Sequence, residues 1–335
     1  MTREMARVPS SAFSMLADAD LVFPAFVDDD GEETPLTNGR FVPVETMASR
    51  KVRREVFEKF YGQYAQFKDV WASLYEGQVK QQLFYSRMRG YSSNFEAAAD
   101  EVNVSVQVCD RLFESVHRHI GKMHDYAALR KELLGVDELH MYDVYAPMIE
   151  GGTWEVTYDE AKEMALAALA PLGEDYQALL KEAFAHRWID VMENKGKKGG
   201  AYSTEGVYGL HPYVLLNYTD TLDDVFTLVH ELGHAMHTWY SCRNQTLFDS
   251  QYKIFVAEVA STTNEILLLE YLLRTTEDKA KQAVLVNHYL ESFKSTLFRQ
   301  TMFEEFERKT NEMGQDGIPL TAQVLSDVYY SLNQE

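Results

Sequence analysis

Residues 221–237 read TLDDVFTLVHELGHAMH and contain the pattern HExxH. Thr221, followed three residues later by Asp224, has the form of a capping box, which predicts that a helix begins here. Leucine, valine and phenylalanine then recur at helical spacing and form one apolar face. The stretch therefore predicts an amphipathic helix with one buried side.

Within this helix His230 and His234 lie one turn apart, so both imidazoles can reach the same tetrahedral zinc ion. Glu231 lies beside them, where a carboxylate can take a proton from a water molecule at the metal. HExxH is expected by chance in only about a few chains in a hundred of this length and composition. We therefore predict that His230 and His234 are zinc ligands and that Glu231 is the catalytic base.

A catalytic zinc site usually has three protein ligands, so a third donor is required. His237 is excluded, because it lies about 10.5 Å along the helix from His230. Residues 253–273, KIFVAEVASTTNEILLLEYLL, predict a second helix with Glu258 inside an otherwise apolar turn. Because a carboxylate is costly to bury unless it is paired or binds a metal, we predict that Glu258 is the third ligand. Glu265, two turns further on, either accepts a hydrogen bond from a ligating histidine or is a solvated charge.

The residues before HExxH predict a small sheet. Residues 211–218, HPYVLLNY, have the composition of a buried strand. Residues 195–203, KGKKGGAYS, form a basic, glycine-rich loop that lacks the GxxxxGKS/T pattern of a phosphate-binding loop. The glycines instead favour the close approach of another backbone.

The remainder of the chain is predicted to be mainly helical. Residues 21–43 are interpreted as a hairpin of LVFPAFV and GRFVPV around an acidic turn, and a solvated turn is favoured there over a calcium site. Apolar residues recur at helical spacing from 45 to 135, and a second helical stretch, interrupted once, covers 159–194. We divide the chain into a helical region with a short hairpin, 1–145, and a zinc-binding catalytic region, 146–335.

Composition restricts the classes of partner. The formal net charge of -20 argues against binding to nucleic acid or to an anionic membrane surface. The 2 cysteines have neither disulfide-framework nor metal-site spacing, as is usual in a reducing compartment. The sequence shows no apolar run of about eighteen residues and no signal-peptide core. We therefore expect a cytoplasmic chain without nucleic-acid or membrane partners.

These motifs resemble those of the oligoendopeptidase F family, which are zinc peptidases related to thimet oligopeptidase. Four segments carry the resemblance: LHMYDVYAPMI at 139–149, GAYSTEGVYGLHPYVLLNYTDTLDDVFTLVHELGHAMH at 200–237, IFVAEVASTTNE at 254–265, and NHYLESFKSTLFRQTMFEEFE at 287–307. HELGH followed by the FVAE helix is far more specific than HELGH alone. The resemblance covers nearly the whole chain.

The resemblance implies a mainly α, zincin-like helical peptidase fold, split by a deep channel, with a small β-sheet beside the HExxH helix. Residues 1–145 would form part of the channel wall. The implied activity is zinc-dependent hydrolysis of short unstructured oligopeptides, with one zinc ion per chain and peptides as partners. An edge strand of the sheet would hold the substrate backbone. The family's ligands, base and edge strand fall on His230, His234 and Glu258, on Glu231, and on Gly200, Ala201 and Tyr202.

Compared with that family, this sequence looks truncated at both ends. Family members have a further N-terminal domain and a later segment whose histidine and tyrosines are thought to bind substrate and stabilise the oxyanion. Tyr329 and Tyr330 precede that segment and do not replace it, and losing one oxyanion donor typically slows turnover about a hundredfold or more. The alternative function is therefore a non-catalytic zinc scaffold that binds peptides or a partner chain, and the missing remainder of the fold is itself a candidate partner.

Overall fold

The computed structural model describes residues 6–149, 154–194, 197–204 and 207–335. The chain forms two compact units, the first of Met1–Met148 with Leu290–Glu335 and the second of Ile149–Tyr289. The predicted division at residue 145 lies close to the first boundary, but residues 290–335 pack with the N-terminal unit rather than with the catalytic region. Among the described helices, none combines the length and the apolar composition that crossing a membrane requires.

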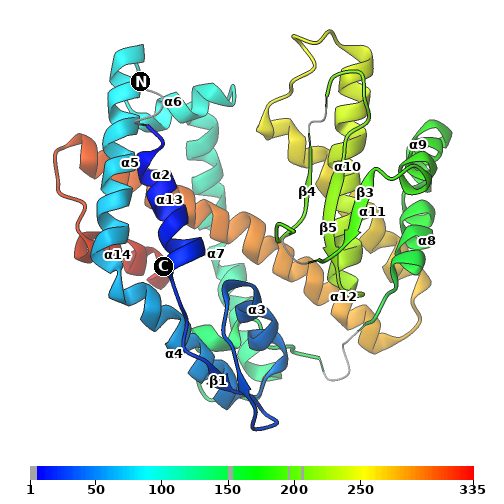
Figure 1. The fold of residues 1–335 in the computed structure, drawn as a ribbon, viewed down its shortest axis with the longest axis horizontal. Coiled ribbons are helices and arrows are strands. Elements are labelled where there is room, and N and C mark those ends of the chain that lie inside the picture. The colour runs from blue at the N-terminus through cyan, green and yellow to red at the C-terminus, as the bar shows by residue number, and fades with distance from the viewer. Residues whose placement is uncertain (1–5, 150–153, 195–196, 205–206) are drawn as a thin grey trace. The chain divides into compact units, whose positions relative to one another are not determined.

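The first unit is almost entirely helical (Figure 1). Its only described strands form one two-stranded hairpin. In chain order its elements are α2 (Val8–Ser14), η1 (Met15–Asp20), β1 (Phe26–Val27), β2 (Glu33–Thr34), α3 (Asn38–Met47), α4 (Arg50–Gln66), α5 (Lys68–Arg89), α6 (Asn94–Glu101), α7 (Val106–Leu133), η2 (Met141–Asp143), η4 (Phe293–Phe298), α13 (Arg299–Gln315) and α14 (Ala322–Gln334).

The predicted hairpin exists, but it is shorter than expected. Strands β1 and β2 pair antiparallel, and the carboxylate of Asp28 accepts hydrogen bonds from the backbone N–H groups of Asp30 and Glu32 within the acidic turn. The second predicted strand, GRFVPV at 39–44, is wrong, because these residues lie in helix α3. The Thr37 side chain caps that helix by accepting from the Arg40 N–H, and this local hydrogen bond outweighs the β-propensity of the valines.

A buried ionic anchor fixes the segment LHMYDVYAPMI within the first unit. The Asp143 side chain is fully buried and accepts hydrogen bonds from Arg50 and Arg53 of α4. Arg130 of α7 donates to the backbone carbonyl groups of Asp143 and Ala146, at 3.1 and 2.6 Å. Because buried charges are stable only when paired and hydrogen-bonded, these contacts hold the segment in one conformation.

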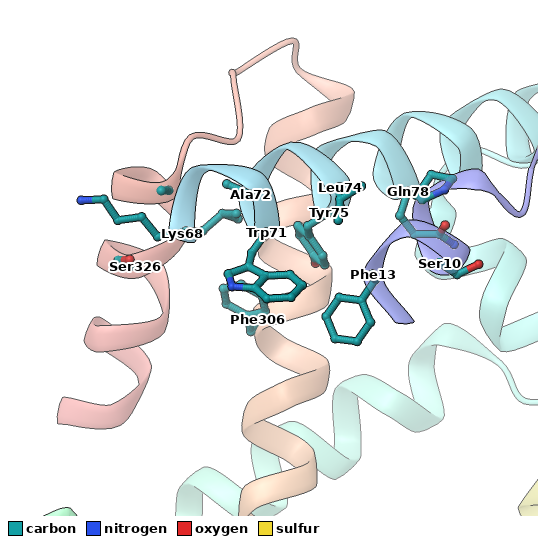
Figure 2. A pocket seen from close by; sticks show the side chains of 13 residues that line it. Ser10, Phe13, Lys68, Trp71, Ala72, Leu74, Tyr75, Gln78, Phe306 and Ser326 are labelled. Atoms are coloured by element: carbon teal, nitrogen blue, oxygen red, sulfur yellow. The ribbon is translucent and has the colours of Figure 1, made fainter. Parts of the chain in front are cut away.

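An apolar pocket of about 500 Å³ also lies in the first unit, between α2, α5, α13 and α14 (Figure 2). The rings of Phe13, Trp71, Tyr75 and Phe306 surround it, as Figure 2 shows. The polar atoms of two of these rings bond elsewhere, since Tyr75 pairs with the Thr310 hydroxyl and Trp71 donates to a backbone carbonyl. None of its described lining residues is a histidine, cysteine, aspartate or glutamate, so we assign no metal chemistry to this pocket.

Glu45 of α3 makes stability of the first unit depend on pH. Its side chain is fully buried, and neither carboxylate oxygen has a hydrogen-bond partner among the described residues. Burial raises the pKa of Glu45 from 4.5 to about 8, against the opposing attraction of Arg53. The folded state holds the Glu45 proton more tightly than the unfolded state. The contribution of Glu45 to the unfolding free energy is therefore complete below pH 4.5 and is lost as the pH rises towards 8.

We expect Glu45→Gln to remove this loss. The unfolding free energy of the variant minus that of the unsubstituted chain should increase by roughly 2–4 kcal/mol from pH 5 to pH 8, measured by urea unfolding at each pH. Glu58→Gln is the matched control, because Glu58 lies on the exposed surface of α4 in an ion pair with Arg54. Parallel pH profiles for the Glu45 variant and the unsubstituted chain would contradict the assignment.

The second unit combines helices with a three-stranded sheet (Figure 1). The sheet order is β3-β5-β4, with β5 in the centre, parallel to β3 and antiparallel to β4. Its core contains the fully buried side chains of Trp188, Leu216, Val229 and Leu268. The elements are α8 (Tyr158–Ala168), η3 (Ala170–Leu172), α9 (Glu174–Ala185), β3 (Ile189–Met192), β4 (Tyr202–Ser203), β5 (Val214–Tyr218), α10 (Leu222–Asn244), α11 (Ile254–Thr275) and α12 (Lys279–Ser292), the last of which ends in the first unit.

The predicted strand over HPYVLLNY is confirmed as β5, and the mainly α fold with a small sheet beside the HExxH helix is also confirmed. The predicted helix over 159–194 is wrong at its C-terminal end. Helix α9 ends at Ala185, Arg187 has a positive φ of 62°, and residues 189–192 form strand β3. Pairing with β5 and the burial of Trp188 outweigh the helical periodicity there.

Candidate metal centre

Helix α10 begins where the sequence predicts it. The Asp224 N–H donates to the Thr221 hydroxyl at 3.2 Å, and the Thr221 N–H donates to the Asp224 carboxylate at 3.1 Å. This reciprocal pair satisfies two backbone donors at the helix start. Val225, Val229 and Leu232 are fully buried on the inner side of the helix, which fixes its rotation about its own axis. The rotation in turn determines where its histidines point.

Three donor atoms from two helices converge beside α10. The Nε2 atoms of His230 and His234 are 3.1 Å apart. The Oε2 atom of Glu258, on α11, lies 3.4 Å from the first and 3.5 Å from the second. Zinc–nitrogen bonds of about 2.0–2.1 Å in a tetrahedron place neighbouring ligand atoms about 3.3 Å apart. The triangle therefore has the dimensions of one face of a tetrahedral zinc site.

The contacts of the two imidazoles are compatible with the tautomer that carries its proton at Nδ1 and leaves the converging Nε2 atoms unprotonated. His230 Nδ1 lies 2.5 Å from Oε1 of Glu265, and the other ring is hydrogen-bonded to the backbone carbonyl of Ala257. Since a neutral imidazole carries one N–H, each ring that donates through Nδ1 presents a lone pair at Nε2. In that tautomer two lone pairs and a carboxylate oxygen lie within 3.5 Å of one another, and a cation between them would relieve their repulsion. The donor set of two imidazole nitrogens and one carboxylate oxygen fits zinc.

Glu258 reaches the histidines for a reason that differs from the predicted one. The sequence argument placed it in a buried apolar turn, but its side chain is 52% exposed, and Phe255 and Val259 beside it are also exposed. The burial argument is therefore wrong for this residue. Its position is set instead by Ser261, whose hydroxyl donates to Glu258 Oε2 at 2.9 Å.

Gly233, the fourth residue of HELGH, allows α10 and α11 to approach closely. A Cβ atom at this position would lie 2.6 Å from the Ser261 Cα and 2.8 Å from the Ala260 carbonyl oxygen. Both are backbone atoms that cannot move aside without moving the helix. Asn264, also buried, ties the helices together by donating to the Val229 carbonyl at 2.9 Å. No role for Gly233, Ser261 or Asn264 is predictable from the sequence, because the crossing point of two helices is not encoded in either helix alone.

Glu231 is held close to the sheet. Its side chain is buried and accepts a hydrogen bond from the backbone N–H of Ser203, in strand β4. Burial raises the pKa of Glu231 above its ordinary value, although the neighbouring His230 and the Ser203 N–H oppose this shift. A carboxylate with a raised pKa is closer to the proton affinity that a general base at neutral pH requires.

Strand β4 lies at an edge of the described sheet, with only β5 beside it. The Thr204 N–H donates to the Tyr213 carbonyl at 2.8 Å, so by alternation Tyr202 also turns its backbone groups towards β5. The Gly200 carbonyl is used by the Asn217 side chain, at 2.7 Å. Of the three residues predicted to hold substrate, Ala201 is thus the one whose backbone groups turn to the open edge, the same edge from which Ser203 donates to Glu231. Part of the preceding glycine-rich loop, 195–196, lies outside the described residues.

His237 does not join the three donor atoms. Its ring stacks on Tyr252 with centroids 3.8 Å apart, and its buried Nδ1 has no hydrogen-bond partner among the described residues. Burial lowers its pKa. Among the described residues, the one group of three or more histidine, cysteine or carboxylate side chains with metal-binding spacing is His230, His234 and Glu258.

Comparison with known proteins gives the same family as the motifs. The chain is 45% identical over 326 residues to oligopeptidase PepF of Bacillus subtilis, which covers 97% of this chain and 48% of that protein. It is 40% identical over 332 residues to group B oligopeptidase PepB of Streptococcus agalactiae, covering 99% of this chain and 55% of the relative. The chain thus spans about half the length of the curated relatives it matches.

A solved structure shares the fold. The crystal structure of oligoendopeptidase-F from Enterococcus faecium superposes with a TM-score of 0.75 at 36% identity, covering 99% of this chain and 53% of that one. The sequence pattern of Peptidase family M3 matches residues 44–335. This match and the overlap with the two relatives cover the helices that carry the three donor atoms. The chain therefore belongs to peptidase family M3.

Proposed function

We propose that this chain is a zinc-dependent endopeptidase that hydrolyses short unstructured oligopeptides. The observation that carries the proposal is the triangle of His230, His234 and Glu258 donor atoms, with sides of 3.1, 3.4 and 3.5 Å. When bound there, a zinc ion would supply Lewis acidity, polarising a peptide carbonyl and acidifying water. The family match and the relatives named as oligopeptidases support peptides as the substrate class.

Glu231 is the proposed proton carrier. Its buried carboxylate lies one residue from a ligand, where it can take a proton from the attacking water and then deliver it to the leaving amine. The Ser203 N–H holds one carboxylate oxygen in place, so the other is free to accept the proton. Glu265 orients His230 through its Nδ1 and raises the basicity of the ligand.

The open edge of β4 is the proposed site for the substrate backbone. An extended peptide added there at Ala201 would run beside the carboxylate of Glu231, because both meet at the same edge. Backbone pairing is largely indifferent to side chains, which supports broad specificity for flexible peptides.

Cys109 and Cys242 are both free, which supports a proposed cytoplasmic location.

The metal assay tests the proposal. We expect about one zinc ion per chain, loss of peptide cleavage on chelation, and its recovery when zinc is added back. His234→Ala should weaken zinc affinity by about a hundredfold or more, measured by competition with a chromogenic chelator, because it removes one of three protein ligands.

His237→Ala is the matched control, because His237 lies on the same helix but contributes no donor atom. It should keep stoichiometric zinc. Absence of zinc uptake by the unsubstituted chain, or equal loss in both variants, would reject the metal centre.

A further inference from the structure

Two of the sequence motifs shared with the family contain none of the metal-centre residues, and they meet within the first unit. LHMYDVYAPMI, 139–149, contains Tyr145, and NHYLESFKSTLFRQTMFEEFE, 287–307, contains Arg299. Arg299 Nη1 lies 3.5 Å from the Tyr145 hydroxyl, at the limit of a hydrogen bond. The contact joins segments more than a hundred residues apart, so the fold rather than the local sequence brings them together.

Arg299 has aromatic neighbours and, in the part of the chain that the structure describes, no acidic partner. Its guanidinium lies 5.3 Å from the centre of the Phe303 ring, which stacks on Tyr329 of α14 with centroids 6.4 Å apart. The phenols of Tyr61 and Tyr329 interact electrostatically with its charge, as does Tyr145. Among the described residues, no carboxylate lies within ion-pair distance of Arg299.

This isolation contrasts with other arginines of the same unit. Arg308, on the same helix, pairs with Asp110 and Glu312 at 2.6 and 3.1 Å, and Arg130 pairs with Glu291. With 52 acidic and 32 basic residues, the chain offers ample carboxylates for ion pairs. Arg299 is also exposed, and Tyr61 and Tyr329 are partly exposed, at 47% and 37%. The N–H donors of Arg299 that do not bond to Tyr145 are therefore accessible to a ligand.

We propose that Arg299, with the hydroxyl groups of Tyr61, Tyr145 and Tyr329, forms a binding site for a carboxylate. A guanidinium donates two parallel hydrogen bonds to a carboxylate, and phenol hydroxyls can add further donors. The aromatic rings reduce local hydration, which strengthens such hydrogen bonds. The net charge of -20 repels polyanions more than monoanions, so a single carboxylate is favoured over a phosphate.

The carboxylate would belong to a peptide, a step that rests on the proposed function. Two sources share this chemistry: the C-terminal carboxylate of the peptide, and the side chain of an aspartate or glutamate within it. The tyrosine hydroxyls and the guanidinium would serve either source.

Three variants of one unstructured peptide, whose parent sequence has no acidic side chain, distinguish the two sources of the carboxylate. The first has a free C-terminal carboxylate, the second a C-terminal amide, and the third an amide with one aspartate introduced. Binding is measured by fluorescence anisotropy with zinc-loaded protein carrying Glu231→Gln, so that the peptides survive. We expect a carboxylate peptide to bind about tenfold or more tightly than the neutral amide, because hydrogen bonds to charged groups contribute more than neutral ones. Whichever carboxylate peptide shows the gain identifies the source.

Arg299→Gln should bring the three peptides within about twofold of each other, and Tyr145→Phe should reduce the preference partly. Arg118→Gln is the control, because it removes the same charge from an exposed site on α7 with no described ion pair. Arg299→Lys keeps the charge without the planar fork and should retain an intermediate preference, which separates binding from misfolding. A purely structural Arg299 would weaken all peptides equally.

Three results would each overturn the carboxylate site. They are equal binding of the three peptides to protein that keeps Arg299, a preference that survives Arg299→Gln, and no binding at millimolar concentration. Cleavage of peptides by the chain with its native Glu231 is measured separately. The carboxylate site can therefore fail while the peptidase function stands, and the reverse outcome is equally visible.

Discussion

Glu231→Gln is expected to reduce peptide cleavage about a thousandfold or more while leaving zinc content near one ion per chain. Glutamine fills the same buried space and can still accept the Ser203 N–H through its amide oxygen. It cannot take a proton at neutral pH, so the step in which water is deprotonated loses its base. The side chain contributes no atom to the triangle of donor atoms, so metal affinity should be almost unchanged.

The measurement compares initial rates on a quenched fluorescent peptide with zinc content determined on the same preparation. Glu270→Gln is the matched control, because Glu270 is an exposed residue of α11 in the same unit. It should retain full cleavage. Activity of the Glu231 variant within tenfold of the unsubstituted chain would reject this residue as the base.

In the same experiment, the unsubstituted chain distinguishes the peptidase from the non-catalytic scaffold. If it holds zinc and binds peptides but never cuts them, the non-catalytic scaffold is the better description of this chain. That outcome would leave the metal centre intact and would remove only the catalytic proposal.

The local features of the site could be predicted from the sequence. A capping box and helical spacing determine where α10 begins and which way its histidines point, because both depend on residues within one turn of each other. The fold class and the family followed from motifs of the same kind. The prediction that Glu258 completes the donor set named a residue whose carboxylate does lie beside the two histidines, but it argued from a burial that this residue does not have.

Features that depend on the approach of distant segments could not be predicted in this way. The N–H of Ser203 reaches Glu231 only because β4 pairs with β5 in one register, and Gly233 of α10 lies against the backbone of Ser261 only because the two helices cross there. Strand β3 was missed for the same reason, since its conformation depends on pairing with a strand more than twenty residues away. Short-range periodicity carries no information on such contacts.

Gly233→Ala is expected to damage both the fold of the second unit and the metal centre. The added methyl carbon would lie 2.6 Å from the Ser261 Cα and 2.9 Å from its nitrogen, which real contacts do not permit, so α10 and α11 must separate. Overpacking of this kind typically costs about 1–3 kcal/mol, and because the nearest atoms all belong to the backbone of α11, this position lies at or above the upper end. The separation moves Glu258 away from the two histidines, since the ligands lie on opposite sides of the crossing.

Two measurements distinguish this effect from an ordinary loss of stability. Under conditions where the variant remains folded, its zinc affinity should fall about tenfold or more, because a ligand displaced from its position costs at least as much as a disturbed supporting contact. Gly62→Ala is the matched control, since Gly62 lies in helix α4 with no atom within 4 Å of an added Cβ, and alanine there should stabilise the helix by about 0.5–1 kcal/mol. Because alanine is the better helix former at both positions, opposite signs of the two stability changes would isolate the close approach of α10 and α11 as the cause. If Gly233→Ala instead stabilised the chain and bound zinc normally, glycine would not be required to bring Glu258 to the histidines.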